Sequence, residues 1–289
     1  MTNPLSHPLI DAALEEDLGS IGDLTVTFFV SDTSLTCARM VAREPCCLAG
    51  IELAADVFRS VDPDLKISIL LGSGSRIGAD GVNTATILEV EGHTRSILTA
   101  ERTALNFAQR LTGVATLTAA FVDAVQGTNA IILDTRKTTP GWRALEKQAV
   151  LMGGGQNHRM GLYDRVMVKD NHLVAEDRLA FIQSGIDELM VHHPTVEVEL
   201  EADTLDQVKD FLTLHGVHYI LLDNMSPETM REAVAMAADS KVKLEASGGI
   251  NLNTVRAAAE TGVDFISVGA LTHSAPSIDL SLDSTRLDA

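Results

Sequence analysis

Basic side chains are concentrated in one part of this chain. Between residues 134 and 172 there are seven Lys or Arg and four Asp or Glu, whereas the whole chain of 289 residues has a formal net charge of −18. Arg136 and Lys137 follow an apolar run, and His158 and Arg159 follow a triple glycine. Arginine can hold a carboxylate with two parallel hydrogen bonds, and lysine offers a compact charge to phosphate. The segment predicts a site for a small anionic ligand, and chance clustering of solvated charges is the alternative.

Carboxylates form a second group of candidates. Alternation along residues 196–202 places Glu197, Glu199 and Glu201 on one face of a predicted strand, and Asp223 closes the next apolar run. Glu201 lies nearest the end of its strand, so we assign it to the ligand and Glu199 to structural support. Glu201 and Asp223 together would suit ribose hydroxyls or Mg²⁺, which prefers oxygen ligands. An exposed edge strand and a helix-capping aspartate are the alternative interpretations.

Two glycine-containing strand ends predict a phosphate site. Backbone N–H groups and the start of a helix after such a strand attract phosphate, and late strands of α/β barrels often supply two such loops. Glycines that serve only tight turns are the alternative. The two strand ends are Ser247-Gly248-Gly249 and Val268-Gly269-Ala270.

The elements that must position these residues change along the chain. The first hundred residues mix a helix at 8–18 with extended runs at 35–44 and 84–92, and a long helical pattern covers 98–125. After it, short apolar strands alternate with helices, which is typical of parallel βαβ units. The predicted strands are 130–133, 165–169, 196–200, 219–222, 242–245 and 264–268.

Six strands are too few for a complete eight-stranded barrel, so a shortened α/β barrel and an open doubly wound sheet remain. Polar or glycine residues at the carboxyl ends of the strands favour the barrel, because that rim is where α/β barrels bind their ligands. These strand-end residues are Asp134, Lys169, Glu201, Asp223, Ser247 and Gly269.

Composition excludes several classes of protein. No stretch approaches the roughly 20 apolar residues of a membrane helix, and the N-terminus lacks a basic region followed by an apolar run. The acidic balance argues against nucleic acid or an anionic membrane as partner. Cys37, Cys46 and Cys47 form neither a zinc motif nor a disulfide framework. We therefore expect a cytoplasmic protein.

Several segments, in this order, are similar to those of the quinolinate phosphoribosyltransferase family, and the resemblance spans nearly the whole chain. They are EEDLGSIGDLT (15–25), ERTALN (101–106), DTRKTTPG (134–141), GGGQNHRMGLYD (153–164), KDNH (169–172), the alternating glutamate strand, LLDN (221–224) and EASGGI (245–250).

This resemblance implies a fold and an assembly. We expect an N-terminal α/β sandwich domain over residues 1–112, joined by the C-terminal tail 274–289, and a shortened α/β barrel over residues 113–273. It also implies a homodimer, or a higher oligomer built from it, in which one subunit's N-terminal domain covers its partner's barrel mouth. Arg102 would then reach the quinolinate site of the partner subunit.

The implied reaction is phosphoribosyl transfer from phosphoribosyl pyrophosphate to the ring nitrogen of quinolinate, with decarboxylation and with Mg²⁺ accompanying the donor. The resemblance distributes the candidate residues over three parts of the site. Around the quinolinate carboxylates it places Arg136, His158, Arg159 and Lys169. At the phosphoribosyl donor it places Lys137, Glu201 and Asp223, to which we assign catalytic roles. Around the 5′-phosphate it places Ser247, Gly248, Gly249 and Gly269, and Thr135, Val268 and Ala270 complete the binding set. His172 is expected to have a capping or surface role.

Alternatives to this assignment remain. The three alternating glutamates leave Glu199 as the alternative to Glu201. A molybdenum-transport-associated relative, a nicotinate-using transferase and a non-catalytic barrel that binds a phosphate ligand are the alternative functions. The dense set of cations favours a dicarboxylate over nicotinate. Lys137, Glu201 and Asp223 together argue against a sensor, because a sensor needs no groups that handle a donor.

Overall fold

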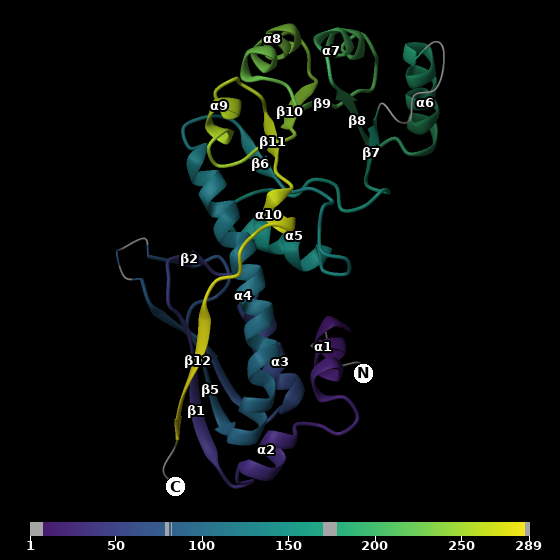
Figure 1. Ribbon diagram of the computed structural model, residues 1–289. Helices are drawn as coiled ribbons and strands as arrows, with labels where there is room; N and C mark the ends of the chain where they lie inside the picture. Colours follow the sequence, from purple (N-terminus) through teal and green to yellow (C-terminus); the bar gives the residue numbers. More distant parts are fainter. Residues whose placement is uncertain (1–7, 79–80, 82, 170–177, 287–289) are drawn as a thin grey trace. The chain divides into compact units, whose positions relative to one another are not determined.

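The computed structural model describes residues 8–78, 81, 83–169 and 178–286 (Figure 1). The first seven residues and His172 lie outside this described part, so the expectations for them stay predictions. The chain divides into two compact units, one of Met1–Leu117 with Ala275–Ala289 and one of Thr118–Ser274. Among the described helices, none combines the length and apolar character needed to cross a membrane.

The first unit is built on a four-stranded antiparallel sheet in the order β12-β1-β5-β3. One face is apolar, because Ala38, Met40 and Ala42 alternate along β1 and are fully buried. The other face carries ion pairs such as Arg39 with Glu89. The elements of this unit are α1 (Pro8–Leu18), α2 (Leu24–Phe29), β1 (Leu35–Ala42), β2 (Cys46–Cys47), α3 (Ile51–Val61), β3 (Lys66–Ile69), β4 (Arg76–Ile77), β5 (Ala85–His93), most of α4 (Thr94–Ala124) and β12 (Leu280–Arg286).

The second unit contains six parallel strands in the order β6-β11-β10-β9-β8-β7. All six predicted strands are present, with ends shifted by one or two residues. The elements are β6 (Ile131–Leu133), α5 (Arg143–Met152), β7 (Arg165–Val168), α6 (Arg178–His192), β8 (Glu197–Ala202), α7 (Leu205–Phe211), β9 (Tyr219–Asp223), α8 (Pro227–Ala237), β10 (Lys243–Ser247), α9 (Val255–Ala259), β11 (Phe265–Ser267) and α10 (Ala270–His273).

This strand order is that of a barrel with one open seam. From β7 to β11 each strand pairs with the next one in sequence, and β11 then pairs with the first strand, β6. Within the described residues, β6 and β7 do not pair, although a single bridge joins Leu133 to Gln156. Right-handed crossovers that all advance in one direction place their helices on one side of the sheet. The prediction of a shortened α/β barrel, rather than a doubly wound sheet, is confirmed.

Side chains alternate across the wall of this barrel. On β8, Val198, Leu200 and Ala202 are fully buried on the helix-covered side, as are Ile220 and Leu222 on β9. The odd-numbered residues of β8 and β9 therefore face the interior of the barrel. Inside the barrel, side chains lie in layers, and the layer nearest the carboxyl ends of the strands is the one closest to the rim. The fold thus directs the three glutamates of β8 inward, at three different depths.

Candidate active site

A cavity of about 820 Å³ lies at the carboxyl ends of the strands in the second unit. Apart from Arg102, every residue predicted for the site lines it. These residues are Thr135, Arg136, Lys137, His158, Arg159, Lys169, Glu201, Asp223, Ser247, Gly248, Gly249, Val268, Gly269 and Ala270. Arg102 belongs to the first unit, where it is exposed on α4, and its expected role in a partner's site stays a prediction.

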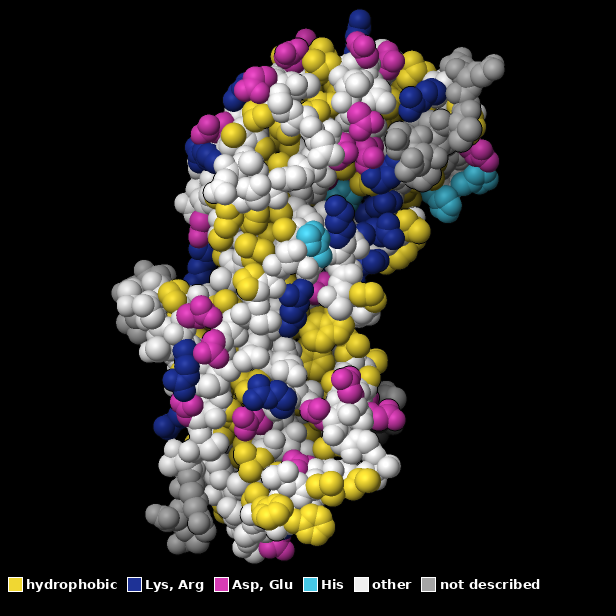
Figure 2. Space-filling view, in the orientation of Figure 1, with side chains coloured by type: hydrophobic (Ala, Val, Ile, Leu, Met, Phe, Trp, Pro, Cys, Tyr) yellow, Lys and Arg dark blue, Asp and Glu magenta, His cyan; other side chains and the backbone are white. Residues whose placement is uncertain are grey.

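Positive charge gathers on one region of the second unit. Figure 2 shows the dark-blue Lys and Arg side chains close together there, next to histidine and a group of acids. Burial and the neighbouring charge of Arg136 lower the pKa of Arg159, which places the two guanidinium groups near each other. The Nε atom of Arg136 is buried and has no hydrogen-bond partner in the described part of the chain. Such a donor suits a ligand anion, because an unpaired buried polar group is costly.

The loop that carries Arg136 and Lys137 is held by two threonine hydroxyl groups, one from the loop and one from α10. The backbone N–H of Lys137 donates to Oγ1 of Thr135 at 3.0 Å, and Oγ1 of Thr272 donates to the carbonyl of Lys137 at 2.7 Å. Arg143 on α5 donates to the carbonyl of Met160 at 3.0 Å and so ties this region to the loop after His158. The two basic segments are thereby fixed to one another.

A buried ion pair lies behind the cavity. Asp134 was expected at the rim, but its carboxylate is fully buried, does not line the cavity and pairs with the fully buried Lys147 of α5. The same carboxylate accepts the backbone N–H of His158 at 2.9 Å, and Lys147 donates to the carbonyl of His158 at 2.9 Å. The pair therefore sets the path of the chain at His158. The sequence did not predict this role of Lys147, because no motif in it relates Lys147 to Asp134.

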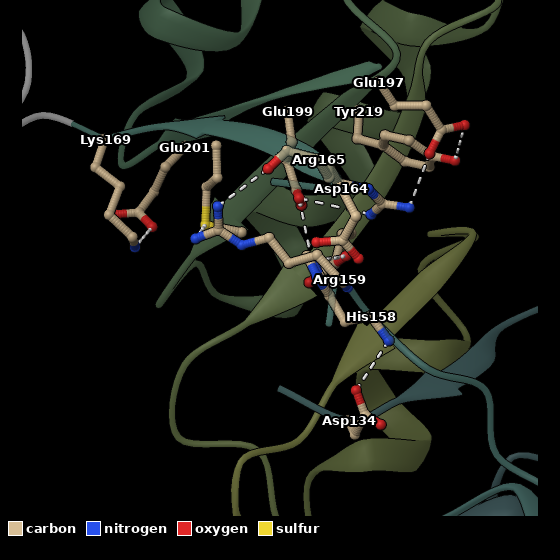
Figure 3. Close-up of polar contacts among 12 residues, drawn as sticks. Asp134, His158, Arg159, Asp164, Arg165, Lys169, Glu197, Glu199, Glu201 and Tyr219 are labelled. Atoms are coloured by element: carbon tan, nitrogen blue, oxygen red, sulfur yellow. Dashed lines mark hydrogen bonds and ion pairs between the residues drawn. The ribbon is translucent and has the colours of Figure 1, made fainter. Parts of the chain in front are cut away.

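His158 lies between two carboxylates inside the barrel (Figure 3). Its Nε2 atom is 3.1 Å from Oε2 of Glu199 and 3.4 Å from Oε2 of Glu245. Burial opposes the charged ring, but the hydrogen bonds and charges of the two glutamates outweigh it and raise the pKa of His158 to about 9. The two carboxylates therefore favour the charged form of His158, which would add a third cation to the wall beside Arg136 and Arg159.

Two of the three predicted donor-binding groups, Glu201 and Asp223, lie on the adjacent strands β8 and β9, and the third, Lys137, follows β6. Lys169, directly after β7, forms an ion pair with Glu201 of β8 (Figure 3). Asp223 ends β9, where its Oδ2 accepts a hydrogen bond from Nδ2 of Asn224 at 2.8 Å. Of the three glutamates on β8, Glu201 reaches the cavity, whereas Glu199 lies one layer deeper and does not line it. The geometry therefore favours Glu201 as the residue that meets a ligand.

Two glycine loops, after β10 and β11, form another part of the cavity wall. Gly248 has φ +90°, and a Cβ atom there would lie 2.2 Å from Oδ1 of Asn224, so no larger residue fits without movement. A Cβ on Gly269 would meet the side chain of Lys137 at 2.9 Å. The helix expected from Leu252 begins at Val255, so the loop residues Gly248, Gly249 and Ile250, rather than the first turn of the helix, line the cavity.

Sequence reasoning missed several lining residues. His273, in the short helix α10, and Asn224, which has φ +53°, both line the cavity. Glu245 also lines it, although it lies in the middle of a strand rather than at its end. Strand alternation could have predicted this position, because Glu245 lies two residues before Ser247 and therefore on the same, inner side of the barrel.

A shortened parallel barrel with a basic cavity and glycine loops at the carboxyl ends of its strands defines a protein that binds phosphorylated anionic ligands. The profile of the quinolinate phosphoribosyl transferase N-terminal domain matches residues 23–112, and that of the C-terminal domain matches residues 114–283. The chain belongs to the quinolinate phosphoribosyltransferase family.

Individual relatives agree with this assignment. The chain is 39% identical over 303 residues to quinolinate phosphoribosyltransferase [decarboxylating] 1b of Nicotiana tabacum, covering 98% of this chain and 85% of the relative. It is 40% identical over 252 residues to a probable nicotinate-nucleotide pyrophosphorylase [carboxylating] of Synechocystis, covering 86% and 83%. The solved structure of the nicotinate-nucleotide pyrophosphorylase from Francisella tularensis superposes with a TM-score of 0.89 at 38% identity, covering 99% and 98%.

Proposed function

We propose that this protein is a decarboxylating quinolinate phosphoribosyltransferase, which forms nicotinate mononucleotide, pyrophosphate and carbon dioxide for NAD biosynthesis. One observation carries the proposal. A single cavity combines a cationic cluster that suits a dicarboxylate, two carboxylates that suit a ribosyl donor and glycine loops that suit a phosphate. Family membership and relatives named for this activity support it.

The cationic wall binds quinolinate in this proposal. Arg136, with its unpaired buried Nε, and Arg159 offer guanidinium groups that can each hold a carboxylate with two hydrogen bonds. His158 supplies a further cation between them and the barrel interior. Three cations on one wall match two carboxylates on one ring better than the single carboxylate of nicotinate.

The glycine loops, together with Lys137, Glu201 and Asp223, bind phosphoribosyl pyrophosphate in this proposal. Backbone N–H groups of the loop at Gly248 and Gly249, and of the turn at Gly269, hold the 5′-phosphate, and Lys137 neutralises charge beside them. Glu201 and Asp223 offer carboxylate oxygens, the donor type that Mg²⁺ prefers, so both fit a magnesium ion that arrives with the pyrophosphate. That ion would supply positive charge to the leaving pyrophosphate.

The chemistry needs positioning and electrostatics rather than a protein nucleophile. The ring nitrogen of quinolinate attacks C1 of the ribose as the bond to pyrophosphate breaks, and the carboxylate of Glu201 stabilises the positive charge that develops on the sugar. The carboxylate at C2 then leaves as carbon dioxide, the electron pair of the broken bond stays on C2, and the positive charge of the alkylated ring nitrogen stabilises it. A proton replaces that carboxylate at C2, which gives nicotinate mononucleotide.

The proposal extends to the assembly. We propose a homodimer in which Arg102 of one subunit completes the quinolinate site of the other. Arg102 is exposed on α4, so its side chain is available to a partner.

One assay tests the function. Quinolinate labelled in its C2 carboxylate is incubated with phosphoribosyl pyrophosphate and magnesium, and released labelled carbon dioxide is counted against a parallel reaction that follows nicotinate mononucleotide formed from nicotinate. We expect release that requires both substrates. Product from nicotinate with none from quinolinate would replace the proposal with a nicotinate-using transferase, and no product from either would favour a non-catalytic barrel.

A further inference from the structure

Two carboxylates lie where a barrel normally carries apolar side chains. Glu199 on β8 and Glu245 on β10 are both fully buried in the barrel interior, where Glu245 also lines the cavity. None of their four oxygens has a hydrogen-bond partner of good geometry in the described part of the chain. Two such carboxylates close together are unfavourable unless positive charge compensates them. Burial and the charge of Glu245 accordingly raise the pKa of Glu199, and a cation close to both carboxylates would stabilise their charged forms.

The nearest cationic group is the ring of His158. Its Nε2 lies 3.1 Å and 3.4 Å from the two carboxylates, whereas Nη1 of Arg165 lies 3.6 Å from Glu199. Arg165 is shared, because it also pairs with Glu197 at 3.0 Å and covers the ring of Tyr219. His158 is thus the only one of these cations that contacts both buried carboxylates.

The backbone of His158 is fixed independently of its ring. Asp134 accepts its N–H and Lys147 donates to its carbonyl. Asp134 and Lys147 thus contact the backbone, the two carboxylates lie beside Nε2, and His158 lines the cavity. The backbone N–H of Arg159 lies 2.6 Å from Nδ1 and favours a ring without a proton there, whereas the two carboxylates beside Nε2 favour the charged ring.

We infer that Glu199 and Glu245 are positioning residues for quinolinate binding, which act by holding the His158 ring as a cation in the cavity wall. The inference rests on the proposed function, because it assigns the cation to a carboxylate of that substrate. Neutral partners could hold the ring in the same place. Only carboxylates also stabilise the protonated form of the ring, and it is this positive charge that attracts an anionic substrate.

A divalent metal is the competing occupant of this layer. One atom each of His158, Glu199 and Glu245 lie within 4.8 Å of one another, which is compatible with a metal site. The surrounding charges argue against it, because Arg165 lies beside Glu199 and the charge of Arg159 also acts on that glutamate. A proton on His158 compensates the carboxylates without adding two more charges beside these arginines. The charged groups that face the ring are Glu199 from β8, Glu245 from β10, Arg165 from β7, Arg159 from the same segment, Asp134 from the end of β6 and Lys147 from α5.

The first experiment compares steady-state kinetics of the full-length protein with those of Glu199→Gln and Glu245→Gln. Glutamine keeps the shape and an acceptor oxygen but removes the charge. We expect the KM for quinolinate to rise about tenfold, as for a weakened hydrogen bond to a charged group, and the KM for phosphoribosyl pyrophosphate to change by less than about twofold. Glu197→Gln is the matched control, since it makes the same change on the same strand without touching His158, and we expect it to resemble the wild type.

The second experiment reads His158 without any substrate. Nitrogen-15 NMR of histidine-labelled protein follows each ring through a pH titration, and the His158→Asn variant identifies its signal. We expect the pKa of His158 to fall by at least about one unit in Glu245→Gln. Because this measurement needs no turnover, it separates the inference from the proposed function, which the wild-type assay tests.

Three results would overturn the inference. One is an unchanged titration of His158 in both variants. Another is an equal rise of both KM values together with a lower midpoint of unfolding, which would indicate a structural role alone. The last is a stoichiometric divalent metal in the purified wild type that Glu245→Gln loses. If one glutamine variant does not fold, the other decides between these outcomes.

Discussion

At the scale of single residues, two neighbouring arginines mark the cavity. Arg136 has a buried Nε with no described acceptor, and Arg159 is held close to it despite its like charge. We expect Arg136→Ala and Arg159→Ala each to lower kcat/KM for quinolinate by roughly 10- to 150-fold, the range of about 1.5–3 kcal/mol for a charged hydrogen bond. Steady-state kinetics checks this, with Arg231→Ala on the exposed face of α8 as control. Wild-type kinetics in both variants would remove the two arginines from the site.

The buried pair of Asp134 and Lys147 makes a prediction about stability. Either Asp134→Asn or Lys147→Met leaves one buried charge uncompensated, which costs about 3–5 kcal/mol of unfolding free energy. Replacing both residues, by Asn and Met, removes both charges and should cost less than the sum of the single changes. Urea unfolding of the three variants measures this coupling, and additive effects would contradict it.

The charge of His158 predicts a dependence of stability on pH. Its pKa in the folded protein, about 9, is higher than the ordinary value of 6.5. The protonated ring therefore contributes its full stabilisation below pH 6.5, and this contribution is lost as the pH rises through about 9. The loss amounts to as much as about 3 kcal/mol. Unfolding free energies at pH 6 and 9.5 should differ less in His158→Asn than in the wild type, and equal differences would argue against a charged ring.

Residue types and their neighbours predicted much of this site, because strand ends and glycine loops are local features. Arg136, Glu201 and Ser247 needed only the end of an apolar run to be placed at the rim. Lys147 and Glu245 were missed because their roles depend on partners in other strands and helices. No spacing in the sequence shows that these partners meet.

At the scale of elements, the loop after β10 makes the sharpest prediction. Gly248 and Gly249 both have positive φ, but only at Gly248 would an added Cβ meet a neighbour, Asn224. Gly248→Ala should therefore raise the KM for phosphoribosyl pyrophosphate and lower stability by more than the roughly 1 kcal/mol of backbone strain expected for Gly249→Ala. Kinetics and thermal unfolding of the two variants measure the difference. A larger effect at Gly249 would mean that strain, rather than the close approach to Asn224, dominates.

Strands were easier to predict than the start of α9. An apolar run bounded by polar residues marks each strand of the second unit, and each was found within two residues of its position. The pattern at Leu252 also looks helical, but Asn251 forms a turn in which its backbone N–H bonds to Oγ1 of Thr254, and this turn delays the helix to Val255. The pairing of β11 with β6, which makes the sheet a barrel, joins residues more than 130 apart and leaves no local signal.

At the scale of the whole molecule, Arg102 makes a prediction about assembly. If each active site takes Arg102 from the partner subunit, Arg102→Ala alone will be inactive. A hybrid dimer with an inactive Lys137→Ala chain will then contain one complete site. We expect mixing and reassembly to recover part of the activity, up to about a quarter of that of wild type if subunits pair at random and each hybrid has one intact site. Verified hybrids without activity would contradict the shared site.

The pairing of β12 with β1 has a consequence for synthesis of the chain. Leu280–Arg286 form an outer strand of the first unit's sheet, beside residues 36–42. All strands of the second unit are present once residue 267 has been added. Domains usually complete folding in the order in which they leave the ribosome. Here the nascent barrel has its full set of strands before residues 280–286 are translated, so the sheet of the first unit, which begins earlier in the chain, is completed after the strands of the barrel.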